Sequence, residues 1–179
     1  MPAHPDVSQL EKLFPCIREY QNLATKHGIN DIFQDNGGKL LQMILITGLR
    51  VTGSREGNDA IDEDGNEYEL KSLNSLLTTS FSTHHHLNLD ILRKYRKVRW
   101  YFAVYEGIEL KSIFLMTPDQ LKPFFEKWEQ EYKLTKTPIN NPKIPLKYVM
   151  QHGTQTYGAQ QTADIKFPSR NRVPRRRQS

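Results

Sequence analysis

Cysteine is nearly absent from this 179-residue chain, with Cys16 as its single representative. One cysteine excludes an intrachain disulfide, and it excludes structural zinc sites that are built on two or more cysteines. A chain without disulfides suits a reducing compartment, so we expect a cytoplasmic location.

Long hydrophobic runs are also missing. The longest apolar stretch lies between Leu40 and Leu49, is interrupted by Gln42 and Thr47, and is too short to cross a bilayer. The N-terminal sequence MPAHPDV has neither a basic start nor an apolar segment, so it predicts no signal peptide. We therefore expect one globular domain that makes no use of a membrane.

Acidic residues are missing from the C-terminal end. Residues 166–179 contain six Lys or Arg side chains and no Asp or Glu, and without this segment the formal net charge changes from +5 to −1. The body of the chain is therefore close to neutral, so the overall basic charge does not by itself indicate a nucleic-acid-binding body. Residues 158–179 are polar and then basic, without hydrophobic periodicity, which predicts a disordered tail.

Helical spacing is present in the first fifty residues. Apolar residues recur every three to four positions after Ser8, which with Glu11 forms a potential capping box. Pro15 lies inside this pattern and predicts either a kink or a later start of the helix. Residues 39–47, ending at Gly48, are apolar on nearly every side, which indicates a helix in a core or a subunit interface.

Strand-like patterns follow. Residues 60–61 and 68–73 flank a turn-rich segment and predict a β-hairpin. Residues 100–104 and 108–116 predict a second hairpin around a Glu-Gly turn. Hairpins in a chain that also carries helices predict an α+β fold, in which helices pack on a mixed sheet.

The remaining elements are predicted from local signals. Residues 88–97 predict a short basic helix, and Thr117 followed by Pro118 predicts a helix that runs to about residue 132. The Pro- and Asn-rich residues 135–145 predict a loop, and residues 146–150 predict a last strand.

Two carboxylates and one amine lie in the first predicted hairpin. Glu69 and Lys71 point to the same face of a strand, and hairpin pairing can bring Asp59 next to Glu69. Carboxylate oxygens suit Mg²⁺, which neutralises charge on a phosphate and lowers the pKa of a bound water. The lysine can orient or deprotonate that water, or stabilise the charge that develops. The pattern therefore predicts metal-assisted phosphodiester hydrolysis.

A solvated strand without a function is the competing interpretation, because Glu-x-Lys occurs by chance on many strands. A calcium loop is excluded by its spacing. If Gly65 held the sixth position, the first and twelfth would be Ala60 and Lys71, which cannot ligate calcium as an EF-hand requires.

Two further segments carry side chains that can contact DNA. Residues 81–88 contain three adjacent histidines, which suggest zinc, but neighbours in an extended chain point in opposite directions. Histidine can instead contact base edges or phosphates. Asn140 and Asn141 precede a proline, and asparagine can pair with adenine in the major groove. For both segments an ordinary polar loop is the alternative.

These motifs belong to longer runs that share one family pattern. The runs are KHGINDIFQDNGGKLLQ at 26–42, ITGL at 46–49, REGNDA at 55–60, EYELKS at 67–72, FSTHHH at 81–86 and INNPKIP at 139–145, with KYVM and HGT after it. Together they resemble the PvuII restriction endonuclease family over about residues 4–157. Asn58 stands where the general nuclease motif has proline, although this family itself has Gly-Asn-Asp. The segment before Ile139 and the basic tail do not follow the resemblance.

The resemblance implies the PD-(D/E)xK nuclease fold, Mg²⁺ as cofactor, and a homodimer that acts on palindromic DNA. The implied catalytic residues are Asp59, Glu69, Lys71, Tyr95 and, as an auxiliary carboxylate, Glu56. The implied metal ligands are Asp59, Glu69 and the backbone carbonyl of Leu70. The implied DNA-reading residues are Asp35, which would face the minor groove, Ser82, His84, His85, His86, Asn140 and Asn141.

The resulting hypothesis is a type II restriction endonuclease of a restriction-modification system that cuts CAGCTG to blunt ends. Residues 1–157 would form the endonuclease domain, with a helical dimerisation part at 1–50 and a catalytic and DNA-recognition part at 51–157. A catalytically silent DNA-binding module should have lost one of Asp59, Glu69 and Lys71, and all three are present. A repair or junction-resolving nuclease would not need the histidine and asparagine segments.

Overall fold

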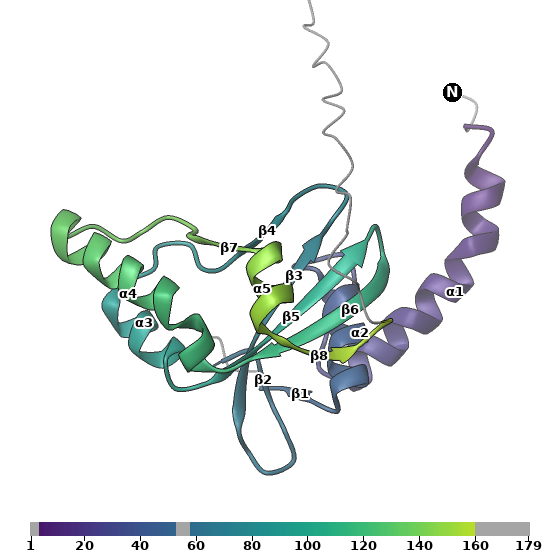
Figure 1. Ribbon diagram of the computed structural model, residues 1–179. Helices are drawn as coiled ribbons and strands as arrows, with labels where there is room; N and C mark the ends of the chain where they lie inside the picture. The colour runs from purple at the N-terminus through teal and green to yellow at the C-terminus, as the bar shows by residue number, and fades with distance from the viewer. Residues whose placement is uncertain (1–3, 53–57, 160–179) are drawn as a thin grey trace, which may run out of the picture.

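The computed structural model describes residues 4–52 and 58–159 (Figure 1). Within them, five helices and a six-stranded mixed sheet form an α+β fold, as the sequence predicts. The predicted auxiliary carboxylate Glu56 and residues 160–179 of the predicted tail lie outside the described residues. The helices are α1 (Val7–Lys26), α2 (Gly37–Thr47), α3 (Leu89–Tyr95), α4 (Pro118–Thr135) and α5 (Leu146–His152). The strands are β1 (Arg50–Val51), β2 (Ala60–Ile61), β3 (Glu67–Asn74), β4 (Ser80–Ser82), β5 (Arg99–Glu106), β6 (Glu109–Met116), β7 (Lys143–Pro145) and β8 (Thr154–Tyr157).

The main sheet has the order β1-β2-β3-β5-β6-β8. Its central pair, β3 and β5, is parallel, and the other neighbours are antiparallel. Both predicted hairpins are confirmed. In the β2–β3 turn, the Asp62 carboxylate accepts the Asn66 N–H at 2.8 Å, and Gly65 has a φ of 81°, which glycine adopts without steric cost. Parallel neighbours need a long connection, and here that connection contains β4 and α3.

Two hydrophobic clusters pack on opposite faces of the sheet. Alternate residues of β5 divide between them, because successive side chains of a strand point to opposite faces. Trp100 and Phe102 belong to the cluster that α3, α4 and α5 cover, whereas Ala103 and Tyr105 belong to the cluster that α2 covers. On β3, Leu73 packs in the first cluster and Leu70 in the second. Glu69 and Lys71 therefore share the face that carries the large aromatic side chains.

Helix α1 differs from its predicted start. The helix begins at Val7, with Asp6 at the cap position and no side-chain cap, so the predicted capping box of Ser8 and Glu11 is wrong. A turn over residues 4–6 replaces it, since the Val7 N–H donates to the His4 carbonyl at 3.0 Å. Pro15 lies inside the helix, and Figure 1 shows the helix axis bending part-way along, as the predicted kink requires.

Helix α2 matches its prediction closely. Leu41 and Ile44 are fully buried, and the helix ends at Gly48 in a left-handed conformation. No residue other than glycine fits at position 37, at the start of this helix, because an added Cβ would lie 2.2 Å from the Asp31 carbonyl oxygen. No helix in the ranges that the structure describes is both long and apolar enough to span a bilayer.

In the C-terminal third, the predicted start of one helix is confirmed and one predicted strand is wrong. Thr117 and Gln120 form a reciprocal capping box at the start of α4, with Pro118 as the first helical residue. The last predicted strand, residues 146–150, is helix α5 instead. Its buried residues Leu146 and Val149 are three positions apart, which is helical rather than strand spacing. The strand at this end is β8, which pairs with β6 at the sheet edge.

Candidate active site

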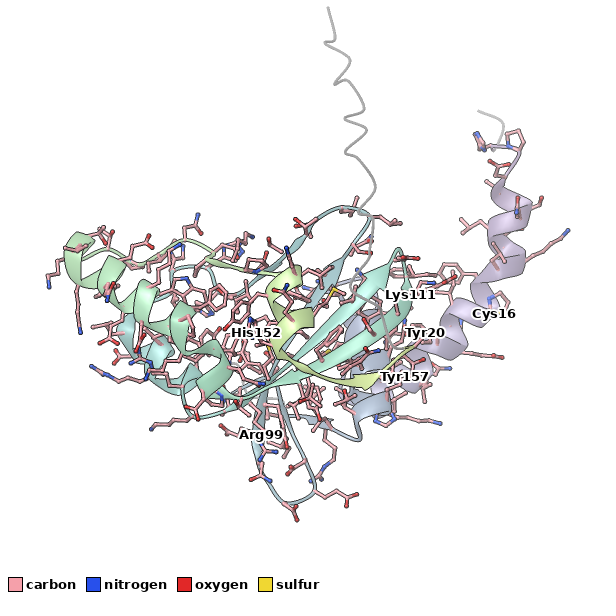
Figure 2. The ribbon with its side chains drawn as sticks, in the orientation of Figure 1. Cys16, Tyr20, Arg99, Lys111, His152 and Tyr157 are labelled. Carbon is pink, nitrogen blue, oxygen red and sulfur yellow. The ribbon has the colours of Figure 1, made fainter. Side chains whose placement is uncertain are left out.

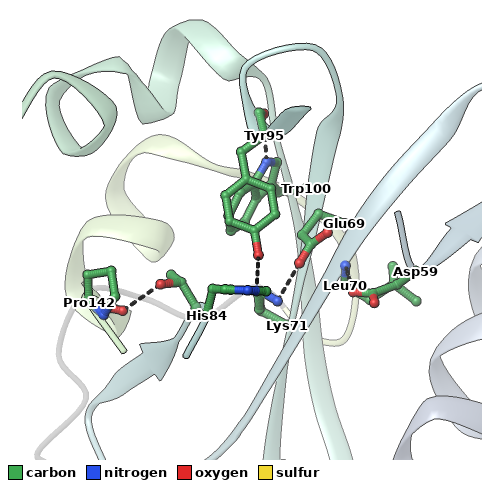
Figure 3. A network of polar contacts seen from close by, with 9 residues as sticks. Asp59, Glu69, Leu70, Lys71, His84, Tyr95, Trp100 and Pro142 are labelled. Carbon is green, nitrogen blue, oxygen red and sulfur yellow. Dashed lines mark hydrogen bonds and ion pairs between the residues drawn. The ribbon is translucent and has the colours of Figure 1, made fainter. Parts of the chain in front are cut away.

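Asp59, Glu69 and Lys71 converge at one place, as the sequence predicts (Figure 3). The β2–β3 register pairs Ala60 with Tyr68, so Asp59 lies beside the next residues of β3. The Asp59 Oδ2 atom accepts the backbone N–H of Leu70 at 2.9 Å, which fixes this carboxylate against the strand. On the face of β3 that bears the aromatic residues, the Lys71 Nζ atom forms an ion pair with Glu69 Oε1.

The Glu69–Lys71 pair is largely withdrawn from solvent. The side chains of Glu69 and Lys71 are 7% and 13% exposed. Burial raises the pKa of the Glu69 carboxyl, the Lys71 ammonium opposes that rise, and the Asp59 charge adds to it. A cation between the two carboxylates would favour their ionised forms, so this site is electrostatically suited to one.

The donor set fits Mg²⁺ better than it fits softer metals. Two carboxylates stand at the site, and within the described residues no group of three or more His, Cys, Asp or Glu side chains could enclose a metal ion. An all-oxygen set with two carboxylates from the described residues leaves positions for water and phosphate, which Mg²⁺ commonly keeps. The carbonyl of Leu70, the third predicted ligand, lies on β3 between Glu69 and Lys71.

Tyr95 lies at the same site. Its ring is buried and makes an edge contact with Trp100, with the ring centroids 4.5 Å apart. Burial, with the Glu69 charge next, raises the pKa of the Tyr95 hydroxyl well above its ordinary value. The hydroxyl therefore remains protonated and can donate one hydrogen bond. Its oxygen lies 3.3 Å from His84 Nδ1 (Figure 3).

An open cleft of about 660 Å³ runs beside these residues. Asp59, Leu70 and Lys71 line it from the hairpin, and Asp35 lines it from the loop before α2. Ser82 lines the same cleft. The structure thus brings predicted catalytic and predicted DNA-reading residues to one surface, although they are far apart in the sequence.

A glutamine on α1 holds the loop that carries Asp35. The Gln21 Nε2 atom donates to the carbonyls of Ile29 and Asn30 at 3.3 and 3.0 Å, and Gln21 Oε1 accepts the Ile32 N–H at 2.9 Å. These contacts fix the backbone just before Asp35. Sequence reasoning missed Gln21, because a single glutamine on a polar helix face has no signal that separates it from ordinary surface residues.

The histidine and asparagine segments lie side by side, through pairing of β4 with β7. The Asn141 N–H donates to the His84 carbonyl at 2.9 Å, and His85 Nδ1 lies 3.4 Å from Asn140 Oδ1. Lys143 Nζ donates to Ser82 Oγ at 2.6 Å, so Lys143 is a further polar group of this surface. The sequence contained Lys143 within the matching INNPKIP run, but no physical argument singled it out.

Three of the predicted DNA-reading residues have left-handed backbone conformations. The φ angles of Asp35, His86 and Asn141 are 48°, 61° and 49°. Such conformations are uncommon for residues other than glycine, and they concentrate at functional sites where the surrounding structure holds them in place. At Asn141 the surrounding structure is the hydrogen bond to His84 and the β4–β7 pair.

A family model described as restriction endonuclease PvuII matches residues 5–157. The chain belongs to the PvuII restriction endonuclease family. Membership confirms the predicted family and makes the chain a site-specific deoxyribonuclease that binds DNA, so the competing hypothesis of a catalytically silent module is wrong. It is also consistent with the PD-(D/E)xK fold, whose sheet here carries Glu69 and Lys71 on β3, with Asp59 directly before β2.

The PvuII-family match ends at residue 157, the last residue of β8. The basic segment after it therefore lies outside the matched region. The same match includes α1 and α2, the two helices that the sequence assigned to dimerisation.

Proposed function

We propose that this chain is a type II restriction endonuclease that hydrolyses both strands of CAGCTG to blunt ends, as a Mg²⁺-dependent homodimer. The observation that carries the proposal is the convergence of Asp59, Glu69 and Lys71. Asp59 and Lys71 line a cleft that Asp35 and Ser82 also line. The recognition sequence and the blunt ends rest on the family resemblance of the DNA-contacting runs.

In this proposal the Asp59 and Glu69 carboxylates, with the Leu70 carbonyl, would hold Mg²⁺. When bound, the ion supplies a water of lowered pKa and neutralises phosphate charge. Lys71 would orient the attacking water or stabilise the negative charge of the phosphorane-like transition state through Nζ. The ion pair with Glu69 holds Nζ at the site before DNA arrives, so little reorganisation is required.

Cleavage of plasmid DNA tests the proposal directly. Purified protein with Mg²⁺ should linearise a plasmid that carries one CAGCTG site, and sequencing of the product should give blunt ends at its centre. The same mixture with EDTA should leave the plasmid intact. Cleavage in EDTA would contradict the metal requirement, and cleavage at another sequence would contradict the proposed target.

The proposed dimer interface consists of apolar side chains on α1 and α2. Leu10, Leu13 and Phe14 are about half exposed on α1, and Leu45 and Ile46 are similarly exposed on α2. Figure 2 shows the α1 side chains, with Cys16 and Tyr20 labelled, at the end of the molecule opposite α4. Apolar side chains grouped at this spacing favour burial against a partner, and a palindrome presents two equivalent half-sites to a symmetric dimer.

Leu13→Glu should shift the protein from dimer to monomer at micromolar concentration, because it places a charge in the proposed interface. Leu134→Glu is a matched control, since Leu134 is an even more exposed leucine at the far end of α4. Sedimentation equilibrium measures both, and cleavage of both strands should be lost only in Leu13→Glu. A monomeric parent protein, or two variants with the same mass, would contradict the interface.

The basic C-terminal segment provides a separate prediction. We propose that it binds DNA phosphates without reading sequence; a segment that makes no DNA contact is the alternative. A chain that ends at Ala159 keeps β8 and the hydrogen bond from Gln155 to the Ala159 carbonyl. If two or three cations of the removed segment bind at once, the negative slope of log K against log salt should become roughly two or three units less steep in the shortened chain. Specific cleavage should persist, and an unchanged slope would support the alternative.

A further inference from the structure

His84 differs from the two histidines that follow it. His85 and His86 are exposed, whereas His84 is partly buried and turned toward the active site. Burial, with the nearby Lys71 ammonium next, lowers the pKa of His84, so its ring is neutral at physiological pH. A neutral imidazole has one nitrogen that donates and one that accepts, and Nδ1 here faces the Tyr95 hydroxyl.

The backbone of His84 faces the opposite way. Its carbonyl accepts the N–H of Asn141 at 2.9 Å, and the residue before it, Thr83, is tied to the Pro142 carbonyl through both N–H and Oγ1. His84 is therefore fixed to the segment that carries Asn140 and Asn141. A displacement of that segment on binding DNA would move His84 with it.

Tyr95 cannot adjust freely to such a movement. Its ring lies against Trp100, which is fully buried, and its carbonyl accepts the Trp100 indole N–H at 3.2 Å. Lys71 Nζ lies 5.9 Å from the centroid of the Tyr95 ring and 5.7 Å from that of Trp100. The hydroxyl end of Tyr95 is thus held between His84 on one side and the Glu69–Lys71 pair on the other (Figure 3).

We propose that His84 is a positioning residue that couples base reading at Asn141 to the chemical step, through its hydrogen bond to Tyr95. The proposal rests on the proposed function, because it assigns a role within the same DNA-cleaving site. The chain of contacts runs from the Asn141 backbone to the His84 carbonyl, and from His84 Nδ1 to the Tyr95 hydroxyl beside Glu69. His84 then acts after binding, in contrast to the base-reading role that the resemblance implies for it.

Three substitutions separate the role of the ring nitrogen from that of side-chain bulk. His84→Asn places its amide near the position of Nδ1, and because an amide both donates and accepts, it keeps a hydrogen-bonding partner for the Tyr95 hydroxyl. His84→Gln places its amide near Nε2 instead, and His84→Ala removes both. His85→Asn is the matched control, because the same chemical change falls on an exposed neighbour whose Nδ1 faces Asn140 rather than Tyr95.

The informative measurement is single-turnover cleavage of a CAGCTG duplex at saturating enzyme with Mg²⁺. His84→Ala and His84→Gln should slow this step by about 10- to 100-fold, the usual cost of losing a group that orients an active-site residue. His84→Asn should recover most of the rate. In a Tyr95→Phe background, His84→Ala should cause little further loss, because the hydrogen bond is already absent.

Binding is measured separately in a Lys71→Ala background, where cleavage does not interfere. There, His84→Ala should keep the ratio of CAGCTG to random-duplex affinity within about threefold. His85→Asn should lower that ratio, and by the same factor whether or not the Tyr95→Phe substitution is also present. The proposal is overturned if His84→Ala lowers the affinity ratio and leaves the cleavage step unchanged, or if its effect on cleavage is the same in the Tyr95→Phe background. Failure of the parent enzyme to cleave would instead contradict the proposed function, so the two failures are distinguishable.

Discussion

Lys71→Ala is expected to bind the CAGCTG duplex about as tightly as the parent enzyme and to cleave it roughly 100- to 10,000-fold more slowly with Mg²⁺. The variant lacks the ammonium that would orient the water or stabilise the developing charge. It also removes the group that opposes the raised pKa of Glu69, so this carboxyl becomes harder to ionise for metal binding. Gel-shift titration and single-turnover cleavage measure the two properties separately.

Two further variants make the Lys71 result specific. Lys71→Met keeps an unbranched side chain against Trp100 and should be as inactive as Lys71→Ala, which separates loss of charge from loss of packing. Lys111→Ala removes a strand lysine whose ion partners, Glu106 and Glu109, lie at an exposed hairpin and should leave cleavage unchanged. Near-parental cleavage by Lys71→Ala, in protein with a parental unfolding temperature, would contradict the catalytic role of Lys71.

Asn141→Gly is expected to lower the preference for CAGCTG over random DNA by roughly 5- to 150-fold, which corresponds to the loss of about 1–3 kcal/mol from one base contact. Glycine adopts the φ of 49° at this position without strain and keeps the N–H that donates to His84. The substitution therefore removes the amide side chain while the backbone stays in place. Competition binding against random duplex measures the ratio.

The matched control is Lys136→Gly. Lys136 also has a left-handed φ, of 57°, but it caps the end of α4 rather than lying in the β4–β7 region. It should leave the affinity ratio unchanged. Asn141→Ala should destabilise the folded protein more than Asn141→Gly does, because a left-handed backbone conformation costs alanine roughly 1–2 kcal/mol. Equal loss of specific and random binding in Asn141→Gly would identify a phosphate contact in place of a base contact.

Local signals predicted most of the elements around the site. The β2–β3 hairpin follows from a turn-rich segment between two short strands, and its pairing alone places Asp59 beside Glu69. The start of α4 follows from Thr117, Pro118 and Gln120, which interact within one turn of chain. In each case the residues that determine the structure are neighbours in the sequence, so a local pattern is enough to predict the element.

Contacts between distant segments were not predictable in this way. Ser82 and Lys143 are 61 positions apart, and no periodicity in either segment indicates that β4 and β7 pair. The family resemblance predicts which residues read DNA, but it does not predict that they share one surface. Gln21 was missed for the same reason, since its role depends on where the 29–32 backbone lies after folding. Helix α5 was mistaken for a strand because a segment this short does not separate the two periods.

The single parallel pairing in the described sheet has a consequence for the order of folding. The β2–β3 and β5–β6 hairpins are each local, so they can form early and independently. The two hairpins become one sheet when β3 pairs in parallel with β5, which places Tyr68 opposite Arg99. The connection between these strands contains β4 and α3, and such non-local pairing is slow. Glu69 and Lys71 lie on β3, Trp100 lies on β5, and Tyr95 lies at the end of α3 in the connection between these strands. A refolding or newly synthesised chain therefore acquires a complete site only at this late step, and recovery of nuclease activity should lag behind the appearance of hairpin structure.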